Sequence, residues 1–317
     1  MVYPRPERQP GQILVKVEKA SGNPVDFKMR DNAFYPHKQF PFISGYDFAG
    51  RVVEEDGGRF QLGQRVFGML PAASQRWGTF AEYVAVDEEF VALVPDNVTM
   101  EQAAAIPLAS LTAIQILAHL GPVVEGERIL IHAGSGGVGT FAIQFAKHLL
   151  KLNVYTTSSN TELCLALGAD RVINYRTENF ADFGEFDYVL DSIGGEYLLR
   201  GLRKCTKHYL SVLNSGWDEY FGHAAMIAVG EVVSTVVINS LHYLTLGRLF
   251  PKYVLGVVQS NGKQLQRIAD LVAQGTIKVI VDKQQGEEEL VGLDQAPLKV
   301  LQRLEAGRTK GKIVLTI

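Results

Sequence analysis

The sequence predicts an α/β protein in which a doubly wound parallel sheet is combined with a second, β-rich domain. Three observations predict this fold. Short strand-like segments separated by turn residues fill residues 12–94. From residue 128 to residue 213, short apolar strands alternate with helical segments, as in parallel sheets that are covered on both faces. A glycine-rich turn follows the first strand of this second region and leads into its helix.

The length and the composition agree with two folded domains. The chain has 317 residues, against roughly 150 residues per domain. Its 31 basic and 34 acidic residues give a net charge of −3, which does not favour a nucleic-acid-binding protein. The two cysteines are too few for a disulfide framework and favour a reducing compartment. We therefore expect a cytoplasmic protein, or a protein of an organelle matrix if a presequence has been removed.

The individual elements follow from local patterns. In the first region, which reads as a compact barrel or sandwich, strands are expected at residues 13–17, 48–53, 65–67 and 80–86. Thr99 followed by Gln102 is a capping box and predicts a helix start. The second region is expected to have strands at residues 128–132, 153–157, 171–173, 188–191 and 209–213, and helices at 138–150 and 162–167. The tail is expected to have helices at 262–274 and 296–306, and strands at 277–281 and 312–317.

The order of these elements predicts a nested organisation. Residues 1–106 form the first part of the β-domain, residues 107–254 form a nucleotide-binding domain, and residues 255–317 complete the β-domain. Within the middle part, residues 224–250 are the most membrane-like, but polar and charged residues interrupt them. A bilayer span needs about 20 mostly apolar residues. We therefore expect no membrane span, and interpret this segment as a buried helix pair or a subunit contact.

The strongest chemical signal is the turn after residues 128–132. It reads Gly134-Ser135-Gly136-Gly137-Val138-Gly139. Its first, third and sixth residues match G-x-G-x-x-G in the setting that the motif requires, after an apolar strand and before a helix. Glycines allow the sharp turn and let backbone N–H groups approach a pyrophosphate at the helix N-terminus. The turn therefore predicts a dinucleotide site.

The next strand indicates which dinucleotide is bound. In NAD sites an acidic residue about 20 positions further on binds the ribose 2′-hydroxyl. Here the strand at 153–157 is followed by Ser158 and Ser159, without Asp or Glu. A carboxylate would repel a 2′-phosphate, whereas hydroxyl groups can donate to it, so NADPH is favoured as the cofactor. The alternative is that the two serines cap the following helix.

Ordered motifs along nearly the whole chain carry a family resemblance. They include Asn23-Pro24-Val25-Asp26, Gly45-Tyr46-Asp47-Phe48-Ala49-Gly50, Gly78-Thr79-Phe80-Ala81-Glu82-Tyr83, Leu167-Gly168-Ala169-Asp170 and Gly311-Lys312-Ile313-Val314. With them the chain resembles the medium-chain dehydrogenase/reductase superfamily, in its zinc-independent quinone oxidoreductase (zeta-crystallin-like) branch, near the enone and alkenal reductases. The resemblance implies a GroES-like β-barrel domain beside a Rossmann domain, with NADPH in the cleft between them. It also implies a homodimer joined through the nucleotide-binding domains.

Two differences from the superfamily's patterns affect the chemistry. Asn23 and Tyr46 stand where zinc-dependent members carry zinc ligands, so no catalytic metal is expected. Without a Lewis acid, hydride addition to an activated C=C bond or a quinone is favoured over alcohol oxidation. Many NADPH-using members also carry a lysine a few residues beyond the serines. Here the nearest basic residues are Arg171 and Arg176.

The resemblance also implies roles for five residues. Tyr46 would donate to the substrate oxygen, or else pack at the domain interface. Asn23 would orient the nicotinamide ribose or substrate, or else cap the turn before Pro24. Lys28 would stabilise enolate charge or bind ribose, or else be a solvated lysine. Thr112 would lie near the nicotinamide, or else supply only a hydroxyl at the start of a helix. Tyr175 would lie near the adenosine phosphate.

Three further polar residues are interpreted as structural. His132 is expected to be buried with its hydrogen bonds satisfied, and Asp26 and Asp47 are expected to fix loops through hydrogen bonds. The substrate pocket is expected to be lined by residues 34–42 and 217–221.

Together, the sequence predicts an NADPH-dependent, zinc-independent oxidoreductase that reduces quinones or the C=C bond of α,β-unsaturated carbonyls by hydride transfer. Its partners would be a small-molecule quinone or enone substrate and a second copy of the chain. Two alternatives remain open at this point. One is a one-electron quinone reductase, and the other is a non-catalytic NADPH-binding member with a regulatory or RNA-associated role.

Overall fold

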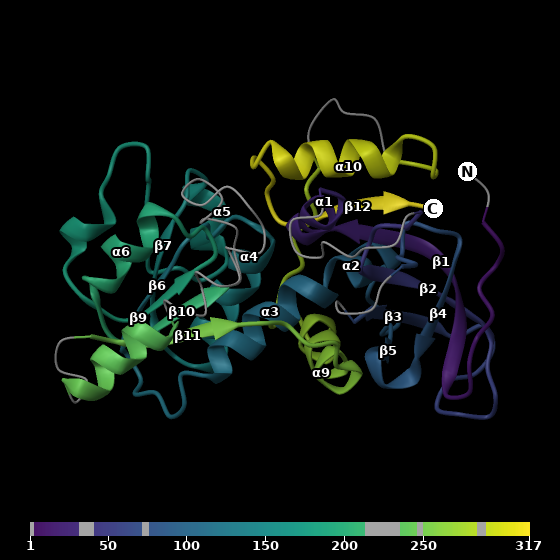
Figure 1. Cartoon of the computed structure of the whole chain (residues 1–317), viewed down its shortest axis with the longest axis horizontal. Helices are drawn as coiled ribbons and strands as arrows, with labels where there is room; N and C mark the ends of the chain where they lie inside the picture. Colours follow the sequence, from purple (N-terminus) through teal and green to yellow (C-terminus); the bar gives the residue numbers. More distant parts are fainter. Residues whose placement is uncertain (1–2, 32–40, 72–75, 213–234, 246–249, 284–289) are drawn as a thin grey trace. The chain divides into compact units, whose positions relative to one another are not determined.

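A computed structural model describes residues 3–31, 41–71, 76–212, 235–245, 250–283 and 290–317. The chain forms two compact units (Figure 1). The first unit combines Met1–Leu111 with Gln259–Ile317, and the second is the continuous segment Thr112–Val258. The expected substrate-pocket segments, residues 34–42 and 217–221, lie almost wholly outside the described residues.

The first unit is built on an antiparallel sheet. Its strands are β1 (Gln12–Gly22), β2 (Asp47–Glu54), β3 (Arg65–Met69), β4 (Tyr83–Asp87), β5 (Val91–Leu93) and β12 (Ile313–Thr316). They follow the order β12-β1-β2-β3-β5, with β4 also paired to β1. The first half of β1 pairs with β4 and its last residues pair with β12, so that Lys19 lies opposite Thr316. The two ends of the chain thus meet in one sheet (Figure 1).

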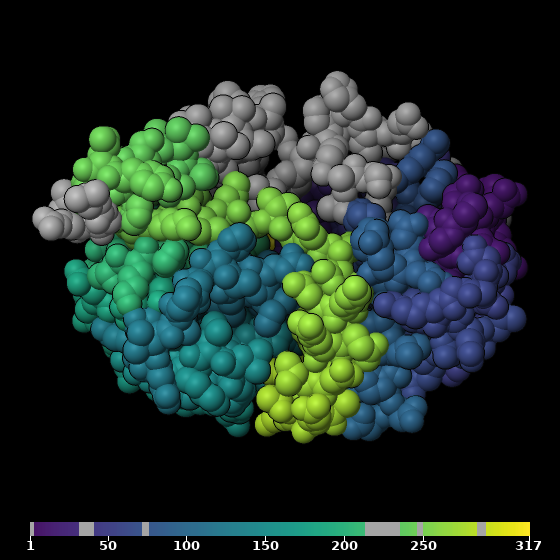
Figure 2. All heavy atoms as spheres, turned by 90° about the horizontal axis from the view of Figure 1, so that it is seen from below, coloured from purple at the N-terminus to yellow at the C-terminus, as the bar shows by residue number. Residues whose placement is uncertain are grey.

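Four helices accompany this sheet within the first unit. They are α1 (Pro24–Arg30), α2 (Met100–Ala105), α9 (Gly262–Ala273) and α10 (Ala296–Glu305). The predicted capping box is confirmed, since Thr99 Oγ1 accepts from the Gln102 backbone N–H at 3.1 Å. Figure 2 shows the yellow-green helix α9 against the blue segment that contains β5, where Leu93 donates to Gln266 at 2.9 Å. Apolar residues of α10 such as Val300 join the buried core of the sheet.

The second unit holds a six-stranded parallel sheet. Its strands are β6 (Arg128–Ile131), β7 (Asn153–Thr157), β8 (Arg171–Ile173), β9 (Phe186–Asp191), β10 (Cys205–Val212) and β11 (Lys252–Gly256). They lie in the order β11-β10-β9-β6-β7-β8. If the strands are numbered from 1 to 6 along the chain within this unit and the sheet is followed from β8 to β11, the order is 3-2-1-4-5-6. This is the arrangement of dinucleotide-binding Rossmann sheets. The predicted fold class, a doubly wound parallel sheet combined with a β-rich domain, is confirmed.

The helices of the second unit follow its strands. After α3 (Pro107–Ala118), which carries the chain into this unit, come α4 (Gly137–Gln144), the π-helical turn Phe145–Leu149, α5 (Thr161–Ala166), α6 (Glu196–Leu202) and a helix at residues 235–244. The single helix expected at 138–150 is therefore an α-helix that continues as a π-helical turn.

Two predictions fail in the described residues. The expected strand at 277–281 forms only one isolated bridge, from Val281 to Lys312, because the outer edge of β12 is shared with a second segment that bridges Val291 to Thr316. The helix at residues 235–244 is not buried within the chain, since Leu244 is 81% exposed. For this part the first alternative, a helix pair buried within the chain, is thus wrong, whereas the second, a subunit contact, stays a prediction. Residues 224–234 and 246–249 lie outside the described residues.

No helix among the described residues has both the length and the apolar character that a membrane crossing requires.

Candidate active site

The glycine-rich turn lies directly after β6 and begins α4 at Gly137. A Cβ added at Gly134 would lie 2.0 Å from Thr156 Oγ1, on the neighbouring strand β7. A Cβ at Gly139 would lie 2.2 Å from the carbonyl oxygen of Ala133. Real Cβ atoms do not approach other atoms so closely. Gly134 is therefore required by the packing of the turn against β7, and Gly139 by the packing of the first turn of α4 against Ala133.

Gly136 differs from the other two motif glycines. It is the N-cap residue of α4, and an added Cβ would meet only the carbonyl oxygen of Ala133, at 3.3 Å. The first turn of a helix leaves backbone N–H groups without partners inside the helix, and its dipole adds partial positive charge. The third position of the motif is therefore open to a ligand, and a phosphate group fits its chemistry.

The backbone of the turn is held in an uncommon conformation. Ala133 has φ of 55°, in the left-handed region that non-glycine residues rarely occupy. Its N–H donates to Thr157 Oγ1 at 3.2 Å, and its carbonyl oxygen accepts from the Gly136 N–H at 2.9 Å. These bonds fix the direction in which the chain leaves β6 and enters α4.

The strand order places this turn at the point where ligands bind in such sheets. β6 lies between β7 and β9. From β7 the chain continues outward to β8 at one edge of the sheet, and from β9 it continues through β10 to β11 at the opposite edge. In open α/β sheets the ligand site lies outside the carboxyl ends of the strands at that reversal. The turn therefore lies at the position where sheets of this kind bind their ligands.

The two serines after β7 have different surroundings. Ser158 is 2% exposed, and its hydroxyl donates to Ser135 Oγ at 2.9 Å, so the glycine turn and the end of β7 are joined directly. Ser159 is exposed. The N-cap of α5 is Asn160, whose side chain accepts from Leu163 N. The expected capping function is thus performed by the residue after the serines.

Tyr175 follows the carboxyl end of β8 and is half exposed. Hydrogen bonds from the Ser159 hydroxyl and then from the Arg176 guanidinium lower the pKa of its phenol. The guanidinium carbon of Arg176 lies 5.9 Å from the centroid of the Tyr175 ring. Hence Ser159, Tyr175 and Arg176 form one polar group at the ends of β7 and β8.

His132 is buried beneath the glycine turn. Its Nδ1 lies 3.1 Å from Thr157 Oγ1, whereas its Nε2 has no hydrogen-bond partner among the described residues. The rings of Phe180 and Tyr197 contact the imidazole edge-to-face. Burial lowers the pKa of His132 to about 4, outweighing the nearby Asp191 carboxylate, so the imidazole is neutral at pH 7. Only one of its two nitrogens is satisfied, which differs from the expectation for this residue.

Thr112 lies in α3 and is 6% exposed. It is one of the first residues of the second unit, which also holds all the other residues predicted to bind the cofactor.

The residues expected to take part in the chemistry lie in the first unit, around a buried ion pair. Lys312 Nζ lies 3.2 Å from Asp47 Oδ2, and its side chain is 3% exposed. The same ammonium group donates to Asn23 Oδ1, while Asn23 Nδ2 donates to Asp47 Oδ2 at 2.8 Å. Ser21 Oγ and the Leu108 N–H add two further donors to Asp47, at 3.0 and 2.9 Å. Asn23 is the N-cap residue of α1, as the alternative for this residue expected, and its side-chain amide is in addition held by Lys312 and Asp47.

Asp26 is also buried in this region, on α1. Its carboxylate accepts from the Asn23 N–H at 2.6 Å and from the Gly45 N–H at 3.1 Å. Burial raises its pKa to about 7, and the charge of Asp47 adds to the rise, while the two backbone N–H groups and Lys312 oppose it. The expectation that Asp26 and Asp47 fix loops through hydrogen bonds is confirmed.

Tyr46 and Lys28 lie on the two segments that these carboxylates hold. Tyr46 stands between Gly45 and Asp47 and is 4% exposed. Lys28 lies in the last turn of α1 and is partly buried. A small cavity of about 10 Å³ is lined by residues that include Asp26 and Tyr46.

Sequence reasoning assigned no role to Lys312, although the motif that contains it was noted. The available signal was its position directly before the apolar strand β12, where a buried lysine needs a carboxylate partner. What the sequence could not provide was the pairing of residues 312 and 47, because they are far apart along the chain.

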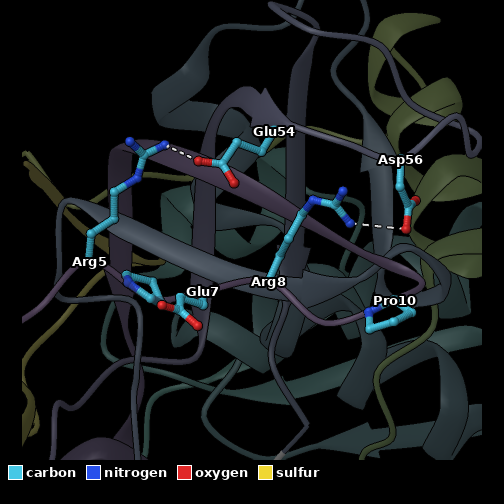
Figure 3. A pocket seen from close by; sticks show the side chains of 7 residues that line it. Arg5, Glu7, Arg8, Pro10, Glu54 and Asp56 are labelled. Atoms are coloured by element: carbon cyan, nitrogen blue, oxygen red, sulfur yellow. Dashed lines mark hydrogen bonds and ion pairs between the residues drawn. The ribbon is translucent and has the colours of Figure 1, made fainter.

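A separate hollow lies on the surface of the first unit. It has a volume of about 490 Å³, and Figure 3 shows its lining. Arg5 pairs with Glu54 at 2.7 Å and Arg8 pairs with Asp56 at 3.0 Å. Both arginines of this hollow are therefore paired with carboxylates of the chain, and none of the predicted site residues lines it.

Comparison with known proteins identifies two family matches along the chain. Residues 9–96 match the family described as alcohol dehydrogenase GroES-like domain, and residues 167–315 match the family described as zinc-binding dehydrogenase. Over 321 aligned residues the chain is 33% identical to 2-methylene-furan-3-one reductase of Solanum lycopersicum, covering 98% of this chain and 73% of the relative. The chain belongs to the medium-chain dehydrogenase/reductase superfamily.

Other members of the superfamily are also similar. The chain is 33% identical over 288 residues to the chloroplastic NADPH-dependent alkenal/one oxidoreductase of Arabidopsis thaliana, covering 87% of this chain and 66% of the relative. The solved structure of a quinone oxidoreductase from Coxiella burnetii superposes with a TM-score of 0.81 at 29% identity, covering 99% of this chain and 93% of the other. The family predicted from the motifs is thus confirmed.

Because the superfamily has zinc-dependent members, the donor set of the first unit is informative. Zinc prefers thiolate, imidazole and carboxylate ligands. Asn23 and Tyr46 offer an amide and a phenol, and the Lys312 ammonium that bonds Asn23 would repel a dication. In the part of the chain that is described, no three His, Cys, Asp or Glu side chains are grouped to hold a metal. These residues do not fit a catalytic zinc.

Proposed function

We propose that this member of the medium-chain dehydrogenase/reductase superfamily is an NADPH-dependent oxidoreductase. It reduces quinones or the C=C bond of α,β-unsaturated carbonyls by hydride transfer, without zinc. The observation that carries the proposal is the glycine turn at the reversal point of the Rossmann sheet, joined to β7 through Ser135 and Ser158. The names of the relatives, which include an alkenal/one oxidoreductase and a quinone oxidoreductase, support the substrate class.

NADPH rather than NADH is favoured by the chemistry at the end of β7. Ser158 and Ser159 stand where NAD sites carry an acidic residue, and a carboxylate there would repel a 2′-phosphate. The turn of Gly134 to Gly139 would hold the pyrophosphate and Tyr175 would lie by the adenosine phosphate. Thr112 is the residue proposed to lie near the nicotinamide.

When bound, the reduced nicotinamide supplies the hydride. The protein's own part is to position and polarise the acceptor. Tyr46 and Lys28 are the proposed sources of the proton or hydrogen bond at the substrate oxygen, with water as the remaining source. Asn23 is proposed to orient the nicotinamide ribose or the substrate, since its amide is held by Asp47 and Lys312.

Zinc independence rests on the donors described above. The proposal is supported by the neutral side chains of Asn23 and Tyr46 and by the ammonium group that contacts Asn23. Dialysis against a strong chelator should therefore leave the rate of NADPH oxidation unchanged, and loss of activity that added zinc restores would contradict this part of the proposal.

We also propose a homodimer joined through the nucleotide-binding units, in a reducing compartment such as the cytoplasm. β11 is an edge strand of the parallel sheet, and the helix at residues 235–244 exposes apolar side chains including Val236 and Leu244. Both cysteines are free and buried. Light scattering of the eluted protein should give twice the mass of one chain.

One experiment tests the central activity. The protein is mixed with NADPH and a panel of quinones and enones, and the loss of absorbance of the reduced nicotinamide is followed. We expect oxidation of NADPH with at least one acceptor class and slower oxidation of NADH. Tight binding of NADPH without oxidation by any acceptor would overturn the enzyme proposal. Formation of semiquinone radicals, detected by electron paramagnetic resonance, would indicate one-electron transfer instead.

A further inference from the structure

The residues that directly follow Ser158 and Ser159 include Thr161 and Glu162 but no cation that could bind a 2′-phosphate. Two arginines are close enough in the sequence to replace the missing cation, Arg171 and Arg176. They flank the short strand β8 on opposite sides, so only one of them lies at the carboxyl end of the sheet, where the dinucleotide is proposed to bind. The surroundings of the two side chains decide between them.

The side chain of Arg171 already has partners within the chain. It is the first residue of β8 and so lies at the amino end of the strand. Its guanidinium pairs with the Glu178 carboxylate at 2.7 Å and lies over the ring of Phe183, 5.2 Å from the centroid. Glu178 also accepts from the Asn174 N–H at 2.9 Å, so this ion pair fixes the loop that follows β8. The charge of Arg171 is neutralised within the protein.

Arg176 has the opposite character. It lies beyond the carboxyl end of β8 and is exposed. Among the described residues no carboxylate forms an ion pair with it, and the contacts of its side chain are with Tyr175. Its positive charge is therefore available for an anion that arrives from solution.

The neighbours of Arg176 are hydroxyl groups that suit the same anion. The phenol oxygen of Tyr175 accepts from the Arg176 guanidinium and from the Ser159 hydroxyl, and these bonds lower the pKa of Tyr175. Ser158, which precedes Ser159, is bonded to Ser135 in the glycine turn. One guanidinium and two hydroxyls thus lie together at the ends of β7 and β8, on the chain segments that adjoin the pyrophosphate cradle.

We propose that Arg176 is the residue that selects a 2′-phosphorylated dinucleotide, by donating to the 2′-phosphate together with Ser159 and Tyr175. This inference rests on the proposed binding of a dinucleotide at the glycine turn. A guanidinium presents several donors in a plane and binds phosphate in a bidentate manner, so Arg176 is suited to a directional contact with the 2′-phosphate. Arg171 has no part in cofactor selection.

The test uses two fragments of the cofactor on the full chain, adenosine 2′,5′-bisphosphate and adenosine 5′-monophosphate, with affinities measured by calorimetry. For Arg176→Ala we expect the affinity for the 2′,5′-bisphosphate to fall by about tenfold or more, because a charge-assisted hydrogen bond to the 2′-phosphate is lost. The affinity for the 5′-monophosphate should stay within about twofold, because that ligand lacks the 2′-phosphate. The matched control, Arg171→Ala, should leave both affinities unchanged.

Each alternative result has a distinct meaning. Equal loss of affinity for both fragments in Arg176→Ala, or loss of 2′,5′-bisphosphate binding in Arg171→Ala, would overturn the assignment of Arg176. Equal affinity of the unmodified protein for the two fragments would overturn 2′-phosphate selection while leaving a dinucleotide site intact. Binding of neither fragment would overturn the proposed dinucleotide site itself. A protein that binds as expected but oxidises no NADPH would refute the proposed enzyme activity and still support Arg176.

Discussion

The ammonium group of Lys312 lies 3.2 Å from the carboxylate of Asp47, and both side chains are almost completely buried, at 3% and 0% exposure. This ion pair joins the last strand region of the chain to the segment that carries Tyr46. It also holds the amide of Asn23 in place, because Lys312 and Asp47 bond to its two ends. A buried pair of this kind is costly to break on one side only, since the remaining charge has lost its partner.

Replacing Lys312 should therefore destabilise the first unit strongly. We expect Lys312→Met to lower the free energy of unfolding by about 3–5 kcal/mol, the usual cost of leaving one buried charge unpaired. Urea denaturation measures this directly. Lys310→Met, two residues away at an exposed position, is the matched control and should change stability by about 0.5 kcal/mol or less.

A second substitution separates lost charge from lost packing. Adding Asp47→Asn to Lys312→Met removes the unpaired carboxylate and should recover part of the lost stability. If the double variant is less stable than the unmodified protein by the sum of the two single effects, the ion pair is not the source of the effect.

Asp26 should make the protein less stable as the pH rises. Its pKa is about 7 in the folded state against 3.8 when unfolded, so between these values the folded protein keeps a proton that the unfolded chain has lost. The free energy of unfolding then falls by about 1.4 kcal/mol for each pH unit in this window. In Asp26→Asn this contribution is absent.

The measurement is urea denaturation of Asp26→Asn and the unmodified protein from pH 4 to pH 7. We expect the variant to gain stability relative to the unmodified protein as the pH rises. The amide loses one hydrogen bond that the carboxyl group accepts, but this lowers the stability by the same amount at every pH and does not change the trend. Asp96→Asn, an exposed aspartate in the same unit, should show no such trend. Parallel profiles for Asp26→Asn and the unmodified protein would contradict the raised pKa.

His132 should have the opposite effect in the second unit. Its pKa is about 4 in the folded state against 6.5 when unfolded, so the unfolded chain binds a proton first as the pH falls. The stability contributed by the neutral imidazole is complete above pH 6.5 and is lost as the pH approaches 4, by about 3 kcal/mol in total. His132→Asn should remove this loss.

The control for His132 is His119, which is exposed in the same unit. His119→Asn should retain the acid sensitivity of the unmodified protein, whereas His132→Asn should flatten the profile between pH 6.5 and pH 4. Identical acid sensitivity in all three proteins would show that the histidine beneath the glycine turn does not control it.

The motif glycines should separate into two classes. Gly134→Ala and Gly139→Ala place a Cβ about 2 Å from other atoms, so each should lower stability by about 1–3 kcal/mol through overpacking. Gly136→Ala meets only one atom, at 3.3 Å, and should unfold close to the temperature of the unmodified protein. Its affinity for NADPH should nevertheless fall, because the added methyl group obstructs the approach of the pyrophosphate.

Thermal unfolding and fluorescence titration with NADPH together check this separation. A Gly136→Ala protein that binds NADPH normally would place the pyrophosphate elsewhere. A marked loss of stability in that variant would instead assign a packing role to all three glycines.

The second unit was largely predictable from the sequence because its signals are local. The strands at 153–157 and 171–173 lie where the sequence placed them, bounded by the change from buried apolar residues to turn residues. The sequence also identified the glycine turn, whose residues are consecutive. β11 was missed, because Lys252–Gly256 carries little periodicity and becomes a strand only by pairing with β10.

The first unit was less predictable because its contacts are distant in sequence. The segment at 277–281 has a strand-like composition but forms only the bridge from Val281 to Lys312. The outer edge of β12 is also occupied by the bridge from Val291 to Thr316. The roles of Asp47 and Lys312 depend on the same long-range pairing, which no local pattern records. Arg171 and Arg176 were equivalent candidates in the sequence and were distinguished only by the partner of each guanidinium.

The discontinuous first unit has a consequence for synthesis on the ribosome. The second unit is one continuous segment and has all its strands once residue 258 has emerged, so it can fold while translation continues. The first unit cannot finish at that stage, because β1 still lacks β12 and Asp47 still lacks its cation. Until residue 312 is available, the earliest-made part of the protein exposes an unpaired sheet edge, and that edge is the part of the nascent chain most in need of a chaperone.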